Sequence, residues 1–206
     1  MKMLKKAAAV LLAAAMSLVM LTACGGGSGS TTQYKLAKTF EGVDKTGKIY
    51  MRLSYGGNEG VSASSADGSY VHVYEARNPL NGMEMVLNKT GFYLIGEDDG
   101  KKLAEAIDTG AEYSTLIIAM PTQENLKNVK VDSNYKLGND TYYAEIIDRN
   151  GTSYAYCYDG DNLVYLVFTA NGQQVVAKVE ETAVTFGSDI DDKIAMKGYT
   201  VVNGKT

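Results

Sequence analysis

The chain has 206 residues, with 24 acidic against 20 basic side chains and a formal net charge of −4 at pH 7. This acidic balance argues against a nucleic-acid partner and against electrostatic docking on anionic lipid. A single histidine nearly excludes catalytic triads and histidine-based zinc sites, while 15 Tyr, 22 Gly and no Trp are typical of a β-rich protein with many tight turns.

The N-terminal segment combines a basic start, an apolar run and a cysteine. Residues 1–6 carry three lysines, and residues 7–21 form an apolar run that has the length of a secretory signal and is short for a transmembrane helix. Leu21, Thr22 and Ala23 then lead directly into Cys24, an order that resembles the lipobox of bacterial lipoproteins. The resemblance implies a signal peptide over residues 1–23 and lipidation of Cys24. The alternative is an ordinary cleaved signal peptide followed by an incidental cysteine.

Lipidation of Cys24 would make the membrane a partner of the mature chain. Each methylene of an acyl chain contributes about 0.8 kcal/mol of membrane binding, so two or three palmitate-like chains form a lipid anchor without a basic patch. Residues 24–32 are Gly- and Ser-rich and predict a flexible linker, and residues 33–206 predict a single β-rich domain. We therefore expect a cell-membrane or envelope location outside the cytoplasm.

Short strands separated by turn dipeptides are predicted from residue 48 onward. Gly-Gly, Asp-Gly and Asn-Gly pairs that favour tight hairpins recur at 56–57, 67–68, 81–82, 99–100, 150–151, 159–160 and 171–172. The strands predicted between them are 48–55, 70–76, 83–87, 92–96, 141–148, 153–158, 163–169 and 173–186. Residues 163–168 are apolar on both faces and are therefore placed in the middle of the sheet or under a covering element.

Helical segments are predicted between the two groups of strands and near the N-terminal end of the domain. Residues 101–107, 115–120 and 123–127 combine helix-forming residues with capping signals and predict a helical insert over one face of the sheet. A further short helix is predicted near 34–40, and residues 189–206 predict an irregular or extended tail. The fold class is thus α+β, mainly β: a curved antiparallel sheet, a half-barrel-like meander, with a short helical insert.

This arrangement resembles small lipoproteins of the LolA/LolB-like class. The segments that carry the resemblance are residues 141–186, with Tyr-Asp-Gly-Asp-Asn-Leu-Val-Tyr at 158–165, and the strand pair 83–87 and 92–96 ahead of Asp98-Asp99-Gly100-Lys101. Members of this class fold as a strongly curved half-barrel whose concave side is plugged by helices. The resemblance implies a hydrophobic space between sheet and helices that binds acyl chains.

Three alternating tyrosines form the candidate ligand-binding surface. Tyr154, Tyr156 and Tyr158 share one face of a predicted strand and offer apolar area with polar tips, which suits a groove for lipid, glycan or peptide. Alternatively they pack under the helical insert. On the other face, Ala155 and Cys157 lie together, and because Cys24 is assigned to acylation, Cys157 has no disulfide partner and is predicted to be a small core residue.

Other chemistry-bearing residues have structural interpretations. His72 shares a strand face with Tyr70 and Tyr74 and is predicted to be a sheet-face histidine rather than a catalytic one. The carboxylate-rich segments 97–100 and 159–162 could bind calcium, but neither has EF-hand spacing and both lie where a turn is needed. Asp189, Asp191 and Asp192 predict a solvated acidic segment.

These observations favour a non-enzymatic lipoprotein that binds or carries an amphiphilic, lipid-like ligand, with no catalytic residues, no metal site and no cofactor. A second hypothesis is a surface interaction or accessory module, which requires a filled core and an exposed patch or sheet edge. A third is a hydrolase, which requires a polar cleft with converging carboxylates.

Overall fold

The computed structural model describes residues 34–107, 128–149, 151–170 and 172–203. The first group of strands is β1 (Ile49–Tyr55), β2 (Asn58–Ser65), β3 (Gly68–Glu75), β4 (Asn78–Asn88), β5 (Gly91–Asp98) and β6 (Lys101–Ala106). The second group is β7 (Lys130–Leu137), β8 (Asp140–Arg149), β9 (Thr152–Asp159), β10 (Asn162–Ala170), β11 (Gln173–Ala183) and β12 (Thr200–Asn203). The helices are α2 (Lys35–Thr39), α3 (Val43–Thr46) and α5 (Ser188–Ile194).

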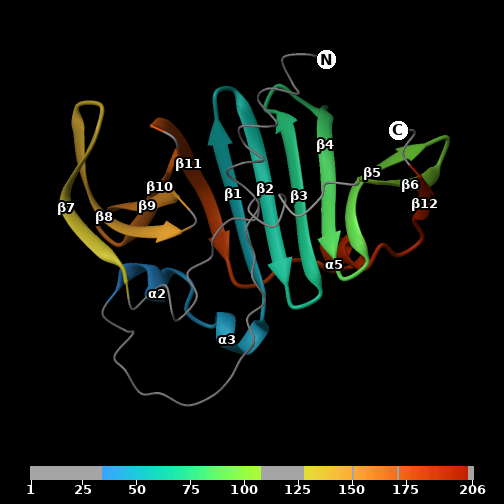
Figure 1. Ribbon diagram of the computed structural model, residues 1–206, viewed down its shortest axis with the longest axis horizontal. Helices are drawn as coiled ribbons and strands as arrows, with labels where there is room; N and C mark the ends of the chain where they lie inside the picture. The colour runs from blue at the N-terminus through green and yellow to red at the C-terminus, as the bar shows by residue number, and fades with distance from the viewer. Residues whose placement is uncertain (1–33, 108–127, 150, 171, 204–206) are drawn as a thin grey trace.

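All of these strands belong to one 12-stranded sheet in the order β12-β6-β5-β4-β3-β2-β1-β11-β10-β9-β8-β7 (Figure 1). The strands β1–β6 form one antiparallel meander and β7–β11 form another, and the two join where β11 pairs with β1. The short strand β12 pairs with β6 in parallel. A mainly β fold built on a curved, open and almost entirely antiparallel sheet is thereby confirmed.

Turn chemistry accounts for the hairpins. Gly56 and Gly57 both have positive φ, at 55° and 83°, which is the backbone of the two-residue turns that match strand twist. The dipeptide Asn81-Gly82 was expected to form a turn but lies inside β4, because the chain turns earlier, at Ala76 and Arg77. The pairing of β3 with β4 shifts register between Tyr74 and Glu75 to accommodate the longer strand.

The helix expected at 101–107 is wrong, because residues 101–106 form strand β6. Asp99 and Gly100 have positive φ, at 48° and 72°, so the chain reverses and Lys101 pairs back with Asp98. Six residues gain ladder hydrogen bonds in this way, and tertiary pairing overrides the helix propensity of Lys, Leu, Ala and Glu. The helices expected at 115–120 and 123–127 lie outside the described residues.

Several elements were not anticipated, although α2 confirms the helix expected near 34–40. Strand β2 has the sequence NEGVSASS, which lacks a strong strand signal and is ordered by pairing with β1 and β3. Strand β7 was also missed, and the tail expected to be irregular or extended contains α5 and the short extended strand β12. Strand β10 lies between β9 and β11 with Leu166 and Val167 fully buried, which confirms its central position.

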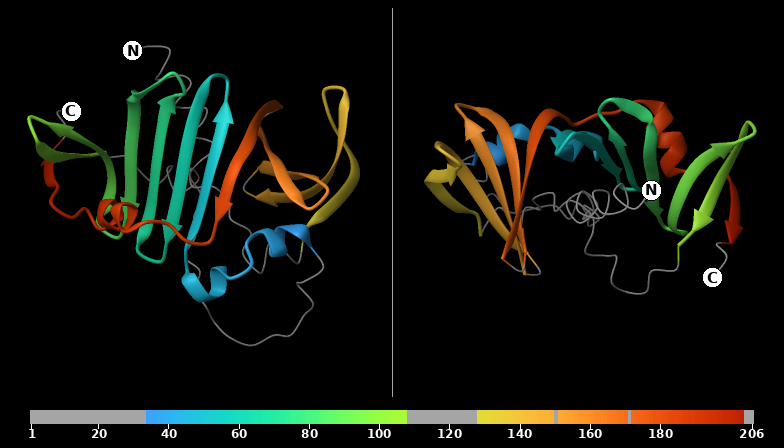
Figure 2. Two further views of the ribbon diagram at one scale, coloured as in Figure 1. Left: turned by 180° about the vertical axis from the view of Figure 1, so that it is seen from behind. Right: turned by 90° about the horizontal axis from the view of Figure 1, so that it is seen from above.

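The sheet is bent (Figure 2). Its two faces carry different hydrophobic clusters. One face, here called the apolar face, is the face on which α2 packs. It gathers Met51, Leu53, Val71, Val73, Met85, Phe92, Ile147, Tyr154, Tyr156, Tyr158, Leu166, Phe168, Ala177 and Val179. On the opposite, outer face, α5 fills the bend between β3–β4 and β5–β6, where Ile194 packs with Tyr70, Val86 and Ala104.

Candidate functional site

The apolar face crosses the junction between the two meanders without interruption. Leu53 of β1 lies opposite Val179 of β11, and both belong to the same buried cluster. Leu166 lies opposite Ala177, and Phe168 lies opposite Tyr154, which extends the face to β9. Opposed residues of antiparallel strands point to the same side of a sheet, so one apolar surface extends from β5 to β8.

The three tyrosines predicted to bind a ligand lie on this face and are buried. Tyr154, Tyr156 and Tyr158 have only 4%, 0% and 2% of their surface exposed. The ring of Tyr154 meets Phe168 edge to face at 5.6 Å, and the Tyr158 hydroxyl lies 3.1 Å from Thr39 Oγ1 of α2. Tyr158 therefore contacts a helix, as the packing interpretation expected, but that helix is α2. A ligand role for the three tyrosines stays a prediction.

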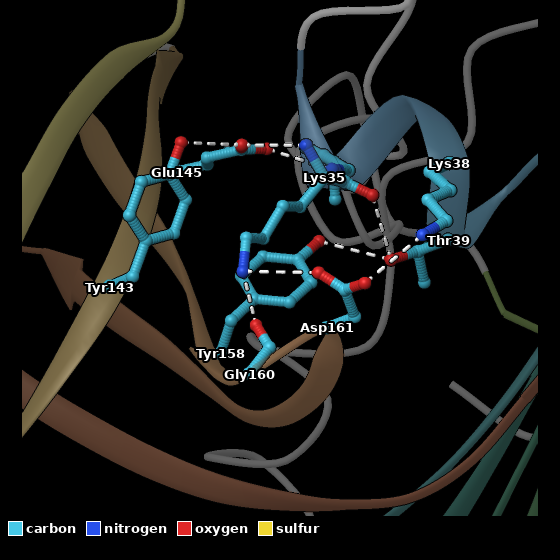
Figure 3. Close-up of polar contacts among 9 residues, drawn as sticks. Lys35, Lys38, Thr39, Tyr143, Glu145, Tyr158, Gly160 and Asp161 are labelled. Carbon is cyan, nitrogen blue, oxygen red and sulfur yellow. Dashed lines mark hydrogen bonds and ion pairs between the residues drawn. The ribbon is translucent and has the colours of Figure 1, made fainter.

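A buried carboxylate holds the N-terminal end of α2 on this face (Figure 3). Glu145 of β8 has no exposed surface, and its Oε1 and Oε2 accept hydrogen bonds from the backbone N–H groups of Lys35 and Leu36, at 2.7 and 2.8 Å. The first N–H groups of a helix lack intrahelical partners, and the preceding residue, Tyr34, gives no side-chain cap. Glu145 therefore caps α2 from more than 100 residues away in the sequence.

Tyr143 completes the environment of this carboxylate. Its hydroxyl donates a hydrogen bond to Glu145 Oε1 at 3.0 Å. Desolvation, followed by this hydrogen bond, raises the pKa of Tyr143 to about 12, so the phenol stays a donor across the physiological range. The Glu145 carboxyl group thus accepts hydrogen bonds from three donors. We call Glu145, Tyr143 and the two N–H groups of α2 the carboxylate clamp.

Lysines of α2 add a second set of contacts, to the turn between β9 and β10. The Lys35 and Lys38 ammonium groups lie 3.3 and 3.1 Å from the Asp161 carboxylate, and Lys35 also donates to the Gly160 carbonyl. Lys35 Nζ lies 5.0 Å from the centre of the Tyr143 ring. Hydrogen bonds from Lys38 and Lys35 lower the pKa of Asp161. One carboxylate of the segment 159–162 is therefore engaged by lysines of this helix.

Glu145 was missed by the sequence analysis, although a signal for it exists. In the strand predicted at 141–148, Glu145 alternates with Tyr143 and Ile147 and therefore occupies an inward-facing position. A carboxylate at such a position requires hydrogen-bond partners, because burial of an unpaired charge is strongly unfavourable. The identity of those partners depends on tertiary packing, which the sequence pattern does not show.

A shallow cleft borders α2 on the side of the β9–β10 turn. Its volume is about 290 Å³, and it is lined by Thr39, Asp161, Asn162, Leu163, Val179, Glu180, Glu181 and Thr182. Glu180 accepts a hydrogen bond from Ser54 and pairs with Lys178, and Glu181 pairs with Arg52 at 3.5 Å. The carboxylates of this cleft are thus already compensated by neighbouring donors. Among the described residues, no group of three or more His, Cys, Asp or Glu is placed to hold a metal ion.

The outer face carries a separate polar cluster beneath α5. His72 shares this face with Tyr70 and Tyr74, as expected, and its ring lies 4.6 Å from that of Tyr74. Lys193 of α5 donates to both oxygens of Glu84, at 2.7 and 2.9 Å. Burial, with a further contribution from the Lys193 ammonium and opposed by Glu84, lowers the pKa of His72. This shift favours the neutral form of the His72 imidazole.

Two other sequence hypotheses have clear outcomes. Cys157 is fully buried beside Ala155, and burial raises the pKa of its thiol to about 12, which confirms a small core residue. The acidic segment is solvated as expected, with the Asp191 and Asp192 side chains 41% and 47% exposed. It also begins α5, with Asp189 and Asp191 in its first turn, where negative charge is favourable. Asp191 pairs with Lys48 at 2.6 Å.

The predicted signal peptide, Cys24 and the linker lie outside the described residues. In the part of the chain that the structure describes, no helix is long and apolar enough to cross a membrane. No known protein family and no curated protein matches the sequence. Among solved structures, a hypothetical protein of Chlamydia trachomatis, CT021, is similar with a TM-score of 0.31 and 9% identity, covering 68% of this chain and 89% of that chain.

Proposed function

We propose that this chain is a membrane-anchored lipoprotein of the cell envelope that binds or carries an amphiphilic, lipid-like ligand on the apolar face. The observation that carries the proposal is the continuity of that face across the β1–β11 junction, where Leu53 and Val179 join the cores of the two meanders. The proposed anchor, acylated Cys24, would keep the domain close to its source of lipid.

The dimensions of the face suit an acyl chain. From β4 to β8 the sheet crosses seven strand spacings of about 4.8 Å, or roughly 33 Å along its surface. A lipid chain that fills one leaflet of a hydrocarbon core about 30 Å thick is roughly 15 Å long. Met51, Met83 and Met85 contribute flexible, polarizable side chains, which adapt to apolar ligands of varied shape.

A headgroup would find polar partners at the edge of the same face. Tyr143 and Lys35 lie at the clamp, next to the buried tyrosines, and Lys35 has 30% of its side chain exposed. Apolar surface bordered by a few positioned polar groups is the usual design of a site for a small amphiphile. The alternative, an interaction module without a ligand space, has the same fold but needs the apolar face to be filled entirely by the chain itself.

Light-dependent labelling in cells tests the ligand. Bacteria that produce the full chain are fed a fatty acid bearing a diazirine and an alkyne, and are then irradiated. Attachment to Cys24 by acylation does not need light, so the light-dependent signal reports non-covalent contact. We expect labelled peptides from β1, β3, β4 and β11, and the interaction-module alternative predicts none above the level of an unrelated lipoprotein.

Two neighbouring valines of β11 provide a matched pair of variants. Val175 packs on the apolar face and Val176 on the opposite face, and both are partly buried. Val175→Asp places a charge on the proposed ligand surface, and we expect it to reduce labelling. Val176→Asp should destabilise the fold to a similar extent but leaves the proposed ligand surface unchanged. Equal labelling of the two variants would contradict the proposal.

The anchor is tested separately with Cys24→Ser. In the wild type we expect incorporation of an alkyne-tagged palmitate without irradiation and recovery of the chain with membranes. The Cys24→Ser chain should incorporate none. Incorporation that persists in this variant would show that Cys24 is not the acylated residue.

A further inference from the structure

Helix α5 is held on the outer face by one buried side chain and a few polar contacts. Ile194 is 2% exposed and packs against the sheet, in a cluster with Tyr70 and Val86. Its carbonyl accepts a hydrogen bond from the Asn88 side chain at 2.8 Å. The helix has seven residues, and no side chain caps its N-terminal end. A helix this short is not stable in water by itself, so α5 depends on these contacts with the sheet.

One oxygen of Glu84 lies between α5 and a histidine of the sheet. Glu84 Oε1 is 2.7 Å from the Lys193 ammonium of α5 and 3.9 Å from Nδ1 of His72 in β3. The second distance is too long for a hydrogen bond, so the neutral imidazole leaves the carboxylate to Lys193. A protonated imidazole would bring a second positive charge to the same oxygen.

The His72 ring is confined beside this ion pair. Its centre lies 4.6 Å from that of the Tyr74 ring. On the side of β4 it lies against Gly82, where a Cβ atom would come within 2.7 Å of Nε2 of the imidazole. The backbone of β4 thus closes that side, and the ring has no room to swing away from Glu84 in that direction.

The neighbouring phenols of β3 stay neutral. Burial is the first cause that raises the pKa values of Tyr70 and Tyr74, that of Tyr74 to about 12. Neither phenol can therefore supply a negative charge to a protonated His72 at physiological pH.

On the side of β2, Glu59 has partners of its own. Its carboxylate accepts a hydrogen bond from the Tyr74 hydroxyl at 2.8 Å and lies 3.6 Å from the Arg52 guanidinium. The residue of β2 opposite His72 is Val61, which carries no charge. A protonated imidazole would thus depend on the carboxylate that already docks α5.

We propose that α5 is a helix released by acid, because a proton on His72 brings a second cation to the carboxylate that holds Lys193. Release takes the ammonium group away and opens the imidazole to water, and both changes favour the protonated ring. While α5 is docked, burial and the Lys193 ammonium lower the pKa of His72, opposed by Glu84. The released state therefore binds the proton more readily than the docked state. Docking is strongest above the ordinary histidine pKa of about 6.5 and weakens as the pH falls below it, by at most about tenfold per pH unit for one proton.

Hydrogen exchange of the full chain in mild detergent, followed from about pH 7.5 to 5, tests the release. The intrinsic rate of each α5 amide is divided by its observed rate at the same pH, so the ratio reports opening of the helix. We expect the protection of the α5 amides to fall about fivefold over this range, while amides of β9 and β10 keep theirs. Constant protection of α5 would overturn the proposal, and so would an equal loss in β9 and β10, which would indicate general unfolding.

Two variants of α5 contacts separate the histidine from the other charges. His72→Gln removes the titrating ring, and the protection of α5 should then not depend on pH. The matched control is Asp191→Asn, which removes another carboxylate contact of the helix, with Lys48 at 2.6 Å, but keeps the histidine. It should lower the protection of α5 and retain the decrease with acid. A decrease that persists in His72→Gln would overturn the proposal.

Lys193→Gln tests competition for the carboxylate and does not require His72→Gln to fold. The amide can still donate to Glu84 but carries no charge, so the pKa of His72 should be closer to its ordinary value. The total loss of α5 protection with acid should then be smaller than in the wild type. An equal loss would show that His72 and Lys193 do not compete for Glu84.

Discussion

Helix α2 packs on the apolar face through a carboxylate that has no exposed surface, whereas α5 packs on the outer face through an ion pair that water reaches. Glu145 accepts two backbone N–H groups of α2 and is fully buried. Glu84 and Lys193 form an ion pair whose side chains are 24% and 28% exposed. Both contacts are short, so their geometry alone does not distinguish them. What differs is the loss in unfolding free energy when one partner is removed, which is larger where water cannot replace that partner.

The largest effect is expected from Glu145→Ala. Removal of the carboxylate leaves two N–H groups of α2 without partners, at about 1–3 kcal/mol each, so we expect a loss of roughly 3 kcal/mol in unfolding free energy. Urea unfolding measures it. Glu145→Gln keeps one acceptor and should lose less. A change below about 1 kcal/mol for Glu145→Ala would show that the clamp is not a buried cap.

A smaller effect is expected from Glu84→Gln on the outer face. The amide keeps a hydrogen bond to Lys193 but removes the attraction between charges that solvent partly screens. For such a pair we expect a loss of about 0.5–1 kcal/mol in unfolding free energy. A loss as large as that of Glu145→Ala would remove the distinction between the two docking sites.

The pH dependence of stability follows from His72. Its pKa is lowered in the folded chain, so the unfolded chain binds more protons around and below its ordinary value of 6.5. Stability contributed by neutral His72 is present above that pH and decreases as the pH falls below it. In His72→Gln this decrease in stability below about pH 6.5 should disappear. Identical pH profiles of the two chains would mean that His72 does not titrate differently on folding.

The smallest effect is expected from Asp161→Asn at the β9–β10 turn. Asp161 is 68% exposed and pairs with two lysines, one of which is equally exposed. Solvent screening makes such pairs weak, so the unfolding free energy should stay within the error of the measurement. The helix should nevertheless remain docked through Glu145, which hydrogen exchange of the α2 amides can verify. Loss of hydrogen-exchange protection of the α2 amides in Asp161→Asn would show that the surface lysines, and not the buried Glu145, hold α2 in place.

Local patterns predicted much of the sheet and failed where distant partners decide the structure. Alternation placed Tyr154, Tyr156 and Tyr158 on one face and Cys157 on the other, because side-chain direction in a strand follows from position alone. The segment 101–106 was assigned as helix because its residues favour helix, and its pairing with β5 overrides that preference.

In the candidate site, too, local patterns predicted some features, and contacts between distant segments determine the others. The sequence indicated an apolar surface with tyrosines, but not that α2 covers Tyr158 or that Glu145 holds α2 in place. Leu36 of α2 and Glu145 of β8 are 109 residues apart in the sequence. No periodicity in the sequence predicts a contact between segments so far apart. An inward-facing carboxylate does indicate that it must have a hydrogen-bond partner.

The most direct test of the proposed function is native mass spectrometry of the full chain, extracted from a bacterial host in mild detergent and released from the micelle by collisions. We expect a chain that begins at Cys24 with covalent acyl groups, and a second series heavier by one non-covalent lipid, which Val175→Asp weakens and Val176→Asp does not. A single series that carries only covalent acyl groups, with no uptake of added fatty acid or phospholipid, would contradict a ligand on the apolar face.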